Sequence, residues 1–169
     1  MEDSQEALKN LDLKGIPTSQ IAAEVGNQVN ELIFDYYDRR SDIIQALPPT
    51  IKLIYYISEL ESAIDRDSLL AIFYNYNRVE VDRFQAAIAE TGHNEFLFLF
   101  KSARAFAEVK YTLDNSIALV TKYPDADLEE LYGPEVVTKL ESIEEEISTL
   151  RYKGVYWERI YAIYERDIL

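Results

Sequence analysis

The chain of 169 residues contains no cysteine and a single histidine. The absence of thiols excludes disulfides, thiol catalysis and zinc–thiolate sites, and it is compatible with a reducing compartment. Five scattered glycines exclude a glycine-rich phosphate loop. The longest purely apolar run, Phe96–Phe100, is far shorter than the roughly 20 residues of a membrane span. The N-terminus opens on Glu2 and Asp3 rather than on a basic stretch, so we expect no secretory signal and a cytoplasmic protein.

Positive charge is also scarce. The 17 Lys and Arg residues stand against 31 Asp and Glu residues, which gives a formal net charge of −14. Residues 111–169 alone hold 13 acidic and 6 basic residues. Such a field repels the phosphates of nucleic acids and membranes and attracts basic proteins. Because 48% of the residues are hydrophobic and 12% aromatic, the chain is too apolar for a disordered acidic protein.

Apolar residues recur at spacings of three and four along most of the chain, as in Ile21, Val25 and Val29. We therefore predict an all-α fold, a single-domain irregular bundle of about six to eight helices over residues 17–169. The acidic segment 1–16 is expected to be a flexible N-terminus. The expected helices begin at 17–19, 50 (capped by Thr50), 69, 79, 94 (capped by Asn94), 117, 134 and 155, with a short helical turn over residues 41–47.

The apolar run Phe96–Phe100 fits a buried strand as well as a helix. Residues 101–105 continue without a turn signal, which favours a helix. The preceding helix is expected to end at Gly92, because glycine readily takes the left-handed conformation at a helix C-terminus.

Few residues suggest catalysis. His93 follows Gly92 at a predicted junction between helices, and no partner that would orient it as a general base can be identified nearby. Asp65 with Glu59 or Glu61 would suit an acid–base pair, but an exposed pair beside Arg66 explains them equally well. We therefore predict no catalytic residue and no enzymatic activity.

Oxygen ligands are the remaining route to a metal site. Asp125, Asp127, Glu129 and Glu130 form an acidic cluster, but it lacks the glycine and the ligand spacing of a calcium loop. A solvated acidic turn explains it better, so we predict no metal and no cofactor.

The acidic tract from Asp125 to Glu146 holds nine carboxylates and one base, Lys139. Helical neighbours three or four residues apart lie about 5–6 Å from each other, which is comparable to the phosphate spacing along DNA. The tract is either a solubilising surface or a binding surface for a basic protein, in particular a DNA-binding protein that would accept it as a DNA mimic. The predicted partner-binding residues are Glu129, Glu130, Glu141, Glu144, Glu145 and Glu146.

A second hypothesis is an immunity-type or antitoxin-type inhibitor of one enzyme. It would use the aromatic residues Tyr152, Tyr156 and Trp157 as anchors in a cleft. Their spacing with Ile160 and Tyr164 favours core packing instead. A monomer and a homodimer are both compatible with the sequence.

The middle of the chain resembles the DNA-mimic protein family, a group of small acidic all-helical proteins. The resemblance rests on the order of parts between Ile51 and Glu108, including Ile72–Asn75 and Ala86–Ile88 before Gly92. Arg66–Leu69 stands where the family has Asn-Gly-Gly-Phe. The resemblance implies a helical monomer or dimer that binds a basic protein through carboxylates, and it assigns no individual residue.

Overall fold

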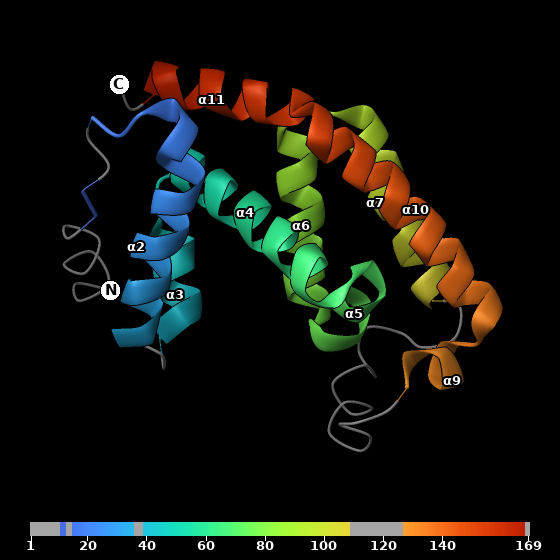
Figure 1. The fold of residues 1–169 in the computed structure, drawn as a ribbon. Helices are drawn as coiled ribbons and strands as arrows, with labels where there is room; N and C mark the ends of the chain where they lie inside the picture. Colours follow the sequence, from blue (N-terminus) through green and yellow to red (C-terminus); the bar gives the residue numbers. More distant parts are fainter. Residues whose placement is uncertain (1–10, 13–14, 36–38, 109–126, 168–169) are drawn as a thin grey trace. The chain divides into compact units, whose positions relative to one another are not determined.

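The computed structural model describes residues 11–12, 15–35, 39–108 and 127–167, and within them the chain is all-α, as predicted. Figure 1 shows the helices in chain order. They are η1 (Thr18–Gln20, a 3₁₀ helix), α2 (Ile21–Asp35), α3 (Arg40–Ala46), α4 (Pro49–Asp67), α5 (Leu69–Asn75), α6 (Arg78–Glu90), α7 (Asn94–Glu108), α9 (Leu128–Tyr132), α10 (Pro134–Lys153) and α11 (Val155–Asp167). These ranges contain no strand, so the run Phe96–Phe100 is helical. The helix expected near residues 117–121 lies outside them.

Contacts divide the chain into two compact units, residues 1–59 with 157–169 and residues 60–156. Helices α4 and α11 contribute residues to both units. Each unit has its own buried side chains, and the organisation of residues 17–169 as one domain stays a prediction.

In the first unit, α2 buries the apolar face that its spacing predicts, with Ile21, Val25 and Val29 completely inaccessible. Leu11 packs against the buried cluster of Leu32 and Ile43. Residues 1–10 of the segment expected to be flexible lie outside the described ranges.

Two side-chain hydrogen bonds connect sequence-distant parts of this unit. The Thr18 hydroxyl donates to Glu165 Oε1 at 3.0 Å, and the Thr50 hydroxyl donates to Asp167 Oδ2 at 2.9 Å. Helix α4 begins at Pro49, so Thr50 lies inside the helix. The prediction that Thr50 caps this helix is therefore wrong, because its hydroxyl is used by α11 instead.

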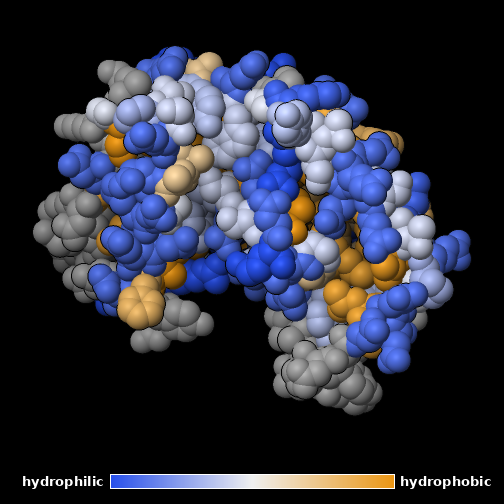
Figure 2. Space-filling model, in the orientation of Figure 1, coloured by the Kyte–Doolittle hydropathy of each residue, from blue (hydrophilic) through white to orange (hydrophobic). Residues whose placement is uncertain are grey.

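In the second unit, α7 packs against α5, α6 and α10, and α10 also contacts α5 and α9. The core is aromatic: the Phe73 and Phe100 rings lie 5.5 Å apart, and the Phe96 and Tyr156 rings lie 5.2 Å apart. Figure 2 shows hydrophilic residues over most of the visible face, with hydrophobic residues gathered beside α5 and α10.

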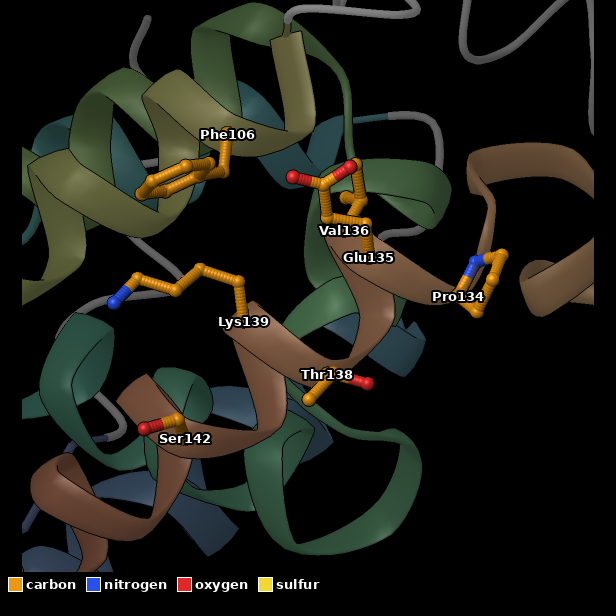
Figure 3. A pocket seen from close by; sticks show the side chains of 7 residues that line it. All are labelled: Phe106, Pro134, Glu135, Val136, Thr138, Lys139 and Ser142. Atoms are coloured by element: carbon orange, nitrogen blue, oxygen red, sulfur yellow. The ribbon is translucent and has the colours of Figure 1, made fainter.

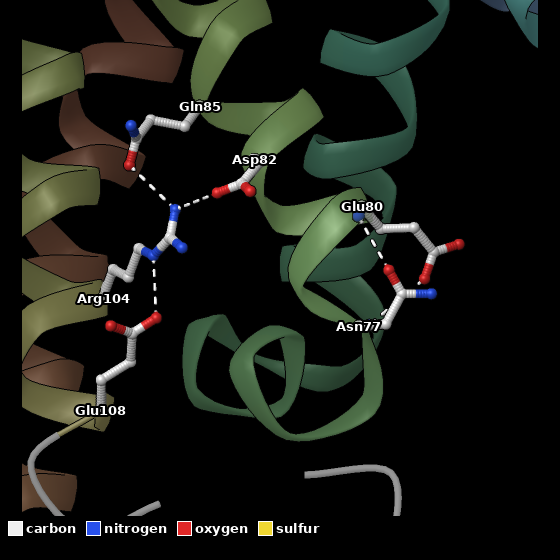
Figure 4. Close-up of polar contacts among 6 residues, drawn as sticks. All are labelled: Asn77, Glu80, Asp82, Gln85, Arg104 and Glu108. Atoms are coloured by element: carbon white, nitrogen blue, oxygen red, sulfur yellow. Dashed lines mark hydrogen bonds and ion pairs between the residues drawn. The ribbon is translucent and has the colours of Figure 1, made fainter. Parts of the chain in front are cut away.

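Arg104 connects α7 to α6, as Figure 4 shows. Its guanidinium donates to Asp82 at 2.6 Å and Gln85 at 3.3 Å, both on α6, and to Glu108 of its own helix at 2.9 Å. Burial opposes the charge of Arg104, but the two carboxylates raise its pKa overall. A partly buried cation with several acceptors holds two helices in a defined orientation.

Helix α6 begins with a capping box, also drawn in Figure 4. The Asn77 side chain accepts from the Glu80 amide at 3.0 Å, and the Glu80 side chain accepts from the Asn77 amide at 3.3 Å. The helix ends before Gly92, whose φ of 68° confirms the predicted left-handed residue.

Among the described residues, no helix combines the length and the apolar character that crossing a bilayer requires.

Candidate functional site

Within the described ranges, the acidic tract begins at Asp127, the residue before α9, a short helix that was not predicted from the sequence. Asp127 caps it, since its carboxylate accepts a hydrogen bond from the Glu129 amide at 2.8 Å. Glu129 and Glu130 occupy the first turn of α9, and both are exposed. Gly133, with a φ of 87°, separates α9 from α10, and Pro134 opens α10 at a position where its missing N–H costs nothing.

Helix α10 displays the rest of the tract. Its inner face buries four side chains at spacings of three and four: Leu140, Ile143, Ile147 and Leu150. This burial fixes the rotation of the helix, so Glu141, Glu145 and Glu146 are exposed. Glu141 and Glu145 are one turn apart on the same line of the outer face.

Glu144 differs from its neighbours. It is half-buried, and its Oε2 accepts a hydrogen bond from the Leu69 amide at 2.7 Å. Leu69 is the first residue of α5, so Glu144 satisfies a backbone donor that a helix start leaves open. Its carboxylate is therefore engaged within the fold, whereas the five other predicted carboxylates face solvent.

Few basic side chains lie near the exposed carboxylates to compensate their negative charge. Within the described ranges, no basic side chain lies within ion-pair distance of Glu129, Glu130, Glu141, Glu145 or Glu146. Two bases of α10 are occupied elsewhere: Lys139 lies 5.8 Å from the centre of the Phe106 ring, and Arg151 binds two carboxylates of α4. Lys153, the third base of α10, is exposed in the last turn of the helix, so within the described residues the outer face of α9 and α10 carries an excess of negative charge.

Arg151 accounts for the pair of carboxylates considered as an acid and a base. Its Nη1 and Nη2 donate to the two Asp65 oxygens at 2.8 and 2.7 Å, and its Nε donates to Glu61 Oε1 at 3.3 Å. The hydrogen bonds from Arg151 lower the pKa of Asp65. Arg66, which was expected beside this pair, binds Asp67 instead. Both carboxylates therefore serve as ion-pair partners that connect α4 to α10.

The three aromatic residues proposed as anchors have different environments. Tyr152 is 95% exposed on α10. Tyr156 is completely buried, and its hydroxyl donates to Glu61 Oε1. Burial and the adjacent Glu61 raise the pKa of Tyr156. Trp157 is half-buried, with its ring stacked on Tyr161 at 5.4 Å. The hypothesis that Tyr156 is a surface anchor is wrong, because its side chain is buried, as are those of Ile160 and Tyr164 further along α11. For Tyr152 the expectation of core packing is wrong, because its side chain is exposed.

His93 has a structural contact in the fold. Its Nδ1 accepts a hydrogen bond from the Phe96 amide at 3.2 Å, so His93 caps α7, which the sequence analysis had assigned to Asn94. Its ring meets Tyr156 edge-on at 6.2 Å. The Nδ1 lone pair of His93 is therefore engaged in the cap of α7.

The described residues include no group of three or more His, Asp or Glu side chains arranged to hold a metal ion. Asp125 of the acidic cluster lies outside the described ranges, and Asp127 of that cluster caps α9.

A groove between α7 and α10 is a feature that the sequence analysis missed (Figure 3). Its volume is about 810 Å³, and it is lined by Phe106 of α7 and by Pro134, Glu135, Val136, Thr138, Lys139 and Ser142 of α10. The available signal was helical spacing: Phe98 and Phe106 lie away from the buried line of Phe96, Phe100, Ala103 and Ala107.

No family model matches the chain, and no curated protein or solved structure matches it.

Proposed function

We propose that this chain is a non-enzymatic binding protein that engages a basic surface of another protein in the cytoplasm. The proposed contact residues are Glu129, Glu130, Glu141, Glu145 and Glu146. The observation that supports this proposal is that all five are exposed on α9 and α10, with no basic side chain of the described ranges within ion-pair distance.

The position of these carboxylates suits recognition. Helix α10 is fixed by four buried side chains, so its outer carboxylates lie in a defined geometry rather than on a mobile tail. A fixed negative surface accelerates the approach of a basic protein and disfavours negatively charged competitors, including nucleic acids and membranes.

A DNA-binding protein is the narrower partner class within this proposal. Adjacent carboxylates on α10 have a spacing of about 5–6 Å, which approaches that of DNA phosphates. A second observation bears on the resemblance to DNA-mimic proteins. Ser68 stands where those proteins have a glycine, and its φ of 97° is a conformation that favours glycine.

The second candidate function, inhibition of one enzyme, draws support from Tyr152. Residues 141, 145, 148 and 152 follow one line along α10, so the exposed Tyr152 ring shares a face with Glu141 and Glu145. An aromatic anchor among carboxylates is the composition of a specific interface rather than of a general DNA mimic.

The proposal is tested by immobilising the protein, exposing it to lysate of its own source at low salt, and eluting at about 0.5 M salt, where the Debye length falls to a few ångströms. We expect basic proteins to be retained at low salt and released by the salt step. Several DNA-binding proteins would favour the DNA mimic, whereas one salt-resistant enzyme would favour the inhibitor.

A charge-reversed variant locates the contact. Glu141→Lys, Glu145→Lys and Glu146→Lys together should abolish capture. The matched control reverses three exposed carboxylates on other helices, Glu31→Lys, Asp35→Lys and Glu90→Lys, and should retain capture because its net charge changes equally. Equal loss in both variants would show that only net charge matters and would overturn the assignment to α10.

A further inference from the structure

We infer that the groove between α7 and α10 receives the apolar face of a basic amphipathic helix from the partner protein. This inference rests on the proposed function and adds the form of the partner. It concerns the flank of α10 that faces α7, beside the outer line of Glu141 and Glu145.

The groove is formed by side chains of two packed helices. Figure 3 shows Phe106 projecting from α7 toward the side chains of α10. Val136 and Pro134 extend its apolar lining, and the Lys139 Nζ lies 5.8 Å from the centre of the Phe106 ring. A groove between two helices is the surface that an amphipathic helix fills when it binds with side chains one turn apart.

Exposed phenylalanine extends this apolar surface along α7. Phe98 is 68% exposed and Phe106 is 40% exposed. Phe98, Ser102 and Phe106 follow each other at intervals of four residues and so lie along one line of the helix. Large aromatic rings that remain in water on one helix face are typical of protein-binding surfaces.

The charge around the groove selects a basic occupant. Glu135 and Lys139 both line the groove, and Glu146 continues the same flank of α10 two turns beyond Lys139, so the acidic excess comes from the carboxylates around the groove. Beside this flank lie Glu141 and Glu145 of the proposed contact surface. A second copy of the chain fits poorly, because each copy carries a net charge of −14 and would bring like charges together.

The experiment uses the full chain and two labelled synthetic peptides of roughly 18 residues, about five helical turns. Both contain only leucine and lysine in equal proportion. In the first peptide the leucines form one helical face, and in the second they are distributed around the helix. Fluorescence anisotropy at low salt measures binding of each peptide to the wild type and to the variants.

We expect the amphipathic peptide to bind at least tenfold more tightly than the scrambled one. Phe106→Ser and, separately, Phe98→Ser should each weaken it by roughly tenfold, as expected for removing an aromatic contact at an interface. Phe34→Ser is the matched control, because Phe34 is 84% exposed on α2, and it should leave the affinity unchanged. Phe106 lines the groove and Phe98 lies on the exposed surface of α7 beyond it. The two variants are used so that impaired folding of one, seen by circular dichroism, leaves the test intact.

Equal affinity for both peptides, or an unchanged affinity in both the Phe106 and the Phe98 variant, would overturn the inference. The proposed function would survive that result if the triple Lys variant of Glu141, Glu145 and Glu146 still weakened both peptides. If neither peptide binds, the inference is also overturned, and the lysate capture then tests the proposed function separately.

Discussion

Glu144 and Glu145 are neighbours in α10 with opposite environments. The Glu144 carboxylate accepts the Leu69 amide, whereas Glu145 is exposed. Glu144→Ala should lower the free energy of unfolding by about 1.5–3 kcal/mol, the usual cost of losing a hydrogen bond to a charged group. Glu145→Ala should change it by less than about 0.5 kcal/mol. Urea unfolding of both variants measures the difference, and equal stabilities would contradict the role assigned to Glu144.

Because Tyr55 is buried, we expect the protein to lose folding stability at alkaline pH. Burial, assisted by the charge of Glu59, raises the pKa of Tyr55 to about 12, from about 10 in an unfolded chain. The unfolded state therefore loses this proton first, and the stabilising contribution falls as the pH rises from about 10 to about 12. At pH 11 the loss is about 1.4 kcal/mol.

Tyr55→Phe removes this contribution. Because burial also raises the pKa of Tyr74 and Tyr164, the useful quantity is the difference between wild type and variant. The change in unfolding free energy between about pH 8 and pH 11 should be smaller in Tyr55→Phe by about 1.4 kcal/mol. An identical change in both proteins would show that the Tyr55 hydroxyl titrates normally.

At the scale of helices, Ser68 forms the junction between α4 and α5. Its backbone has a φ of 97°, which is strained for a residue with a Cβ, and its hydroxyl accepts the Ala71 amide at 3.3 Å. Ser68→Gly relieves the strain and loses the cap, whereas Ser68→Ala keeps the strain and loses the cap. The glycine variant should therefore be the more stable by about 1 kcal/mol, the reverse of their order inside a helix. Thermal melting compares the two, and a more stable alanine variant would contradict this account.

Helix positions follow closely from apolar spacing, because each helix hides one stripe of side chains. The predicted start at Leu69 and end at Gly92 agree with α5 and α6. The caps were less predictable. Thr50 is used by Asp167, which lies 117 residues away, and the capping nitrogen of α7 comes from a histidine rather than from the expected asparagine. Such assignments depend on contacts that local sequence does not contain.

In the candidate site, too, the features set by local helical spacing could be predicted, whereas those set by distant contacts could not. Exposure of Glu141 and Glu145 could be predicted from the helical pattern, since they lie opposite the buried line, whereas Glu146 lies on the flank of α10. The engagement of Glu144 could not, because Leu69 is 75 residues away in sequence. The pairing of Arg151 with Asp65 spans 86 residues, so the local sequence, which shows only the neighbouring Arg66, does not contain it.

For the whole molecule, the net charge of −14 should oppose compactness. Added salt screens repulsion between exposed carboxylates over about 10 Å at 0.1 M, while partly buried pairs such as those of Arg104 are screened less. The melting temperature should therefore rise between about 0.01 and 0.1 M sodium chloride. Differential scanning calorimetry measures this, and a fall in melting temperature would mean that the ion pairs outweigh the repulsion.

The most direct test of the central claim is the salt dependence of affinity for the partner recovered by capture. Calorimetric titration should show the Kd of the wild type rising steeply between about 0.05 and 0.5 M salt. Replacing Glu129, Glu130, Glu141, Glu145 and Glu146 by glutamine should weaken binding at low salt and flatten this dependence. A salt-insensitive Kd, or the same Kd in both proteins, would contradict recognition through the carboxylates of α9 and α10.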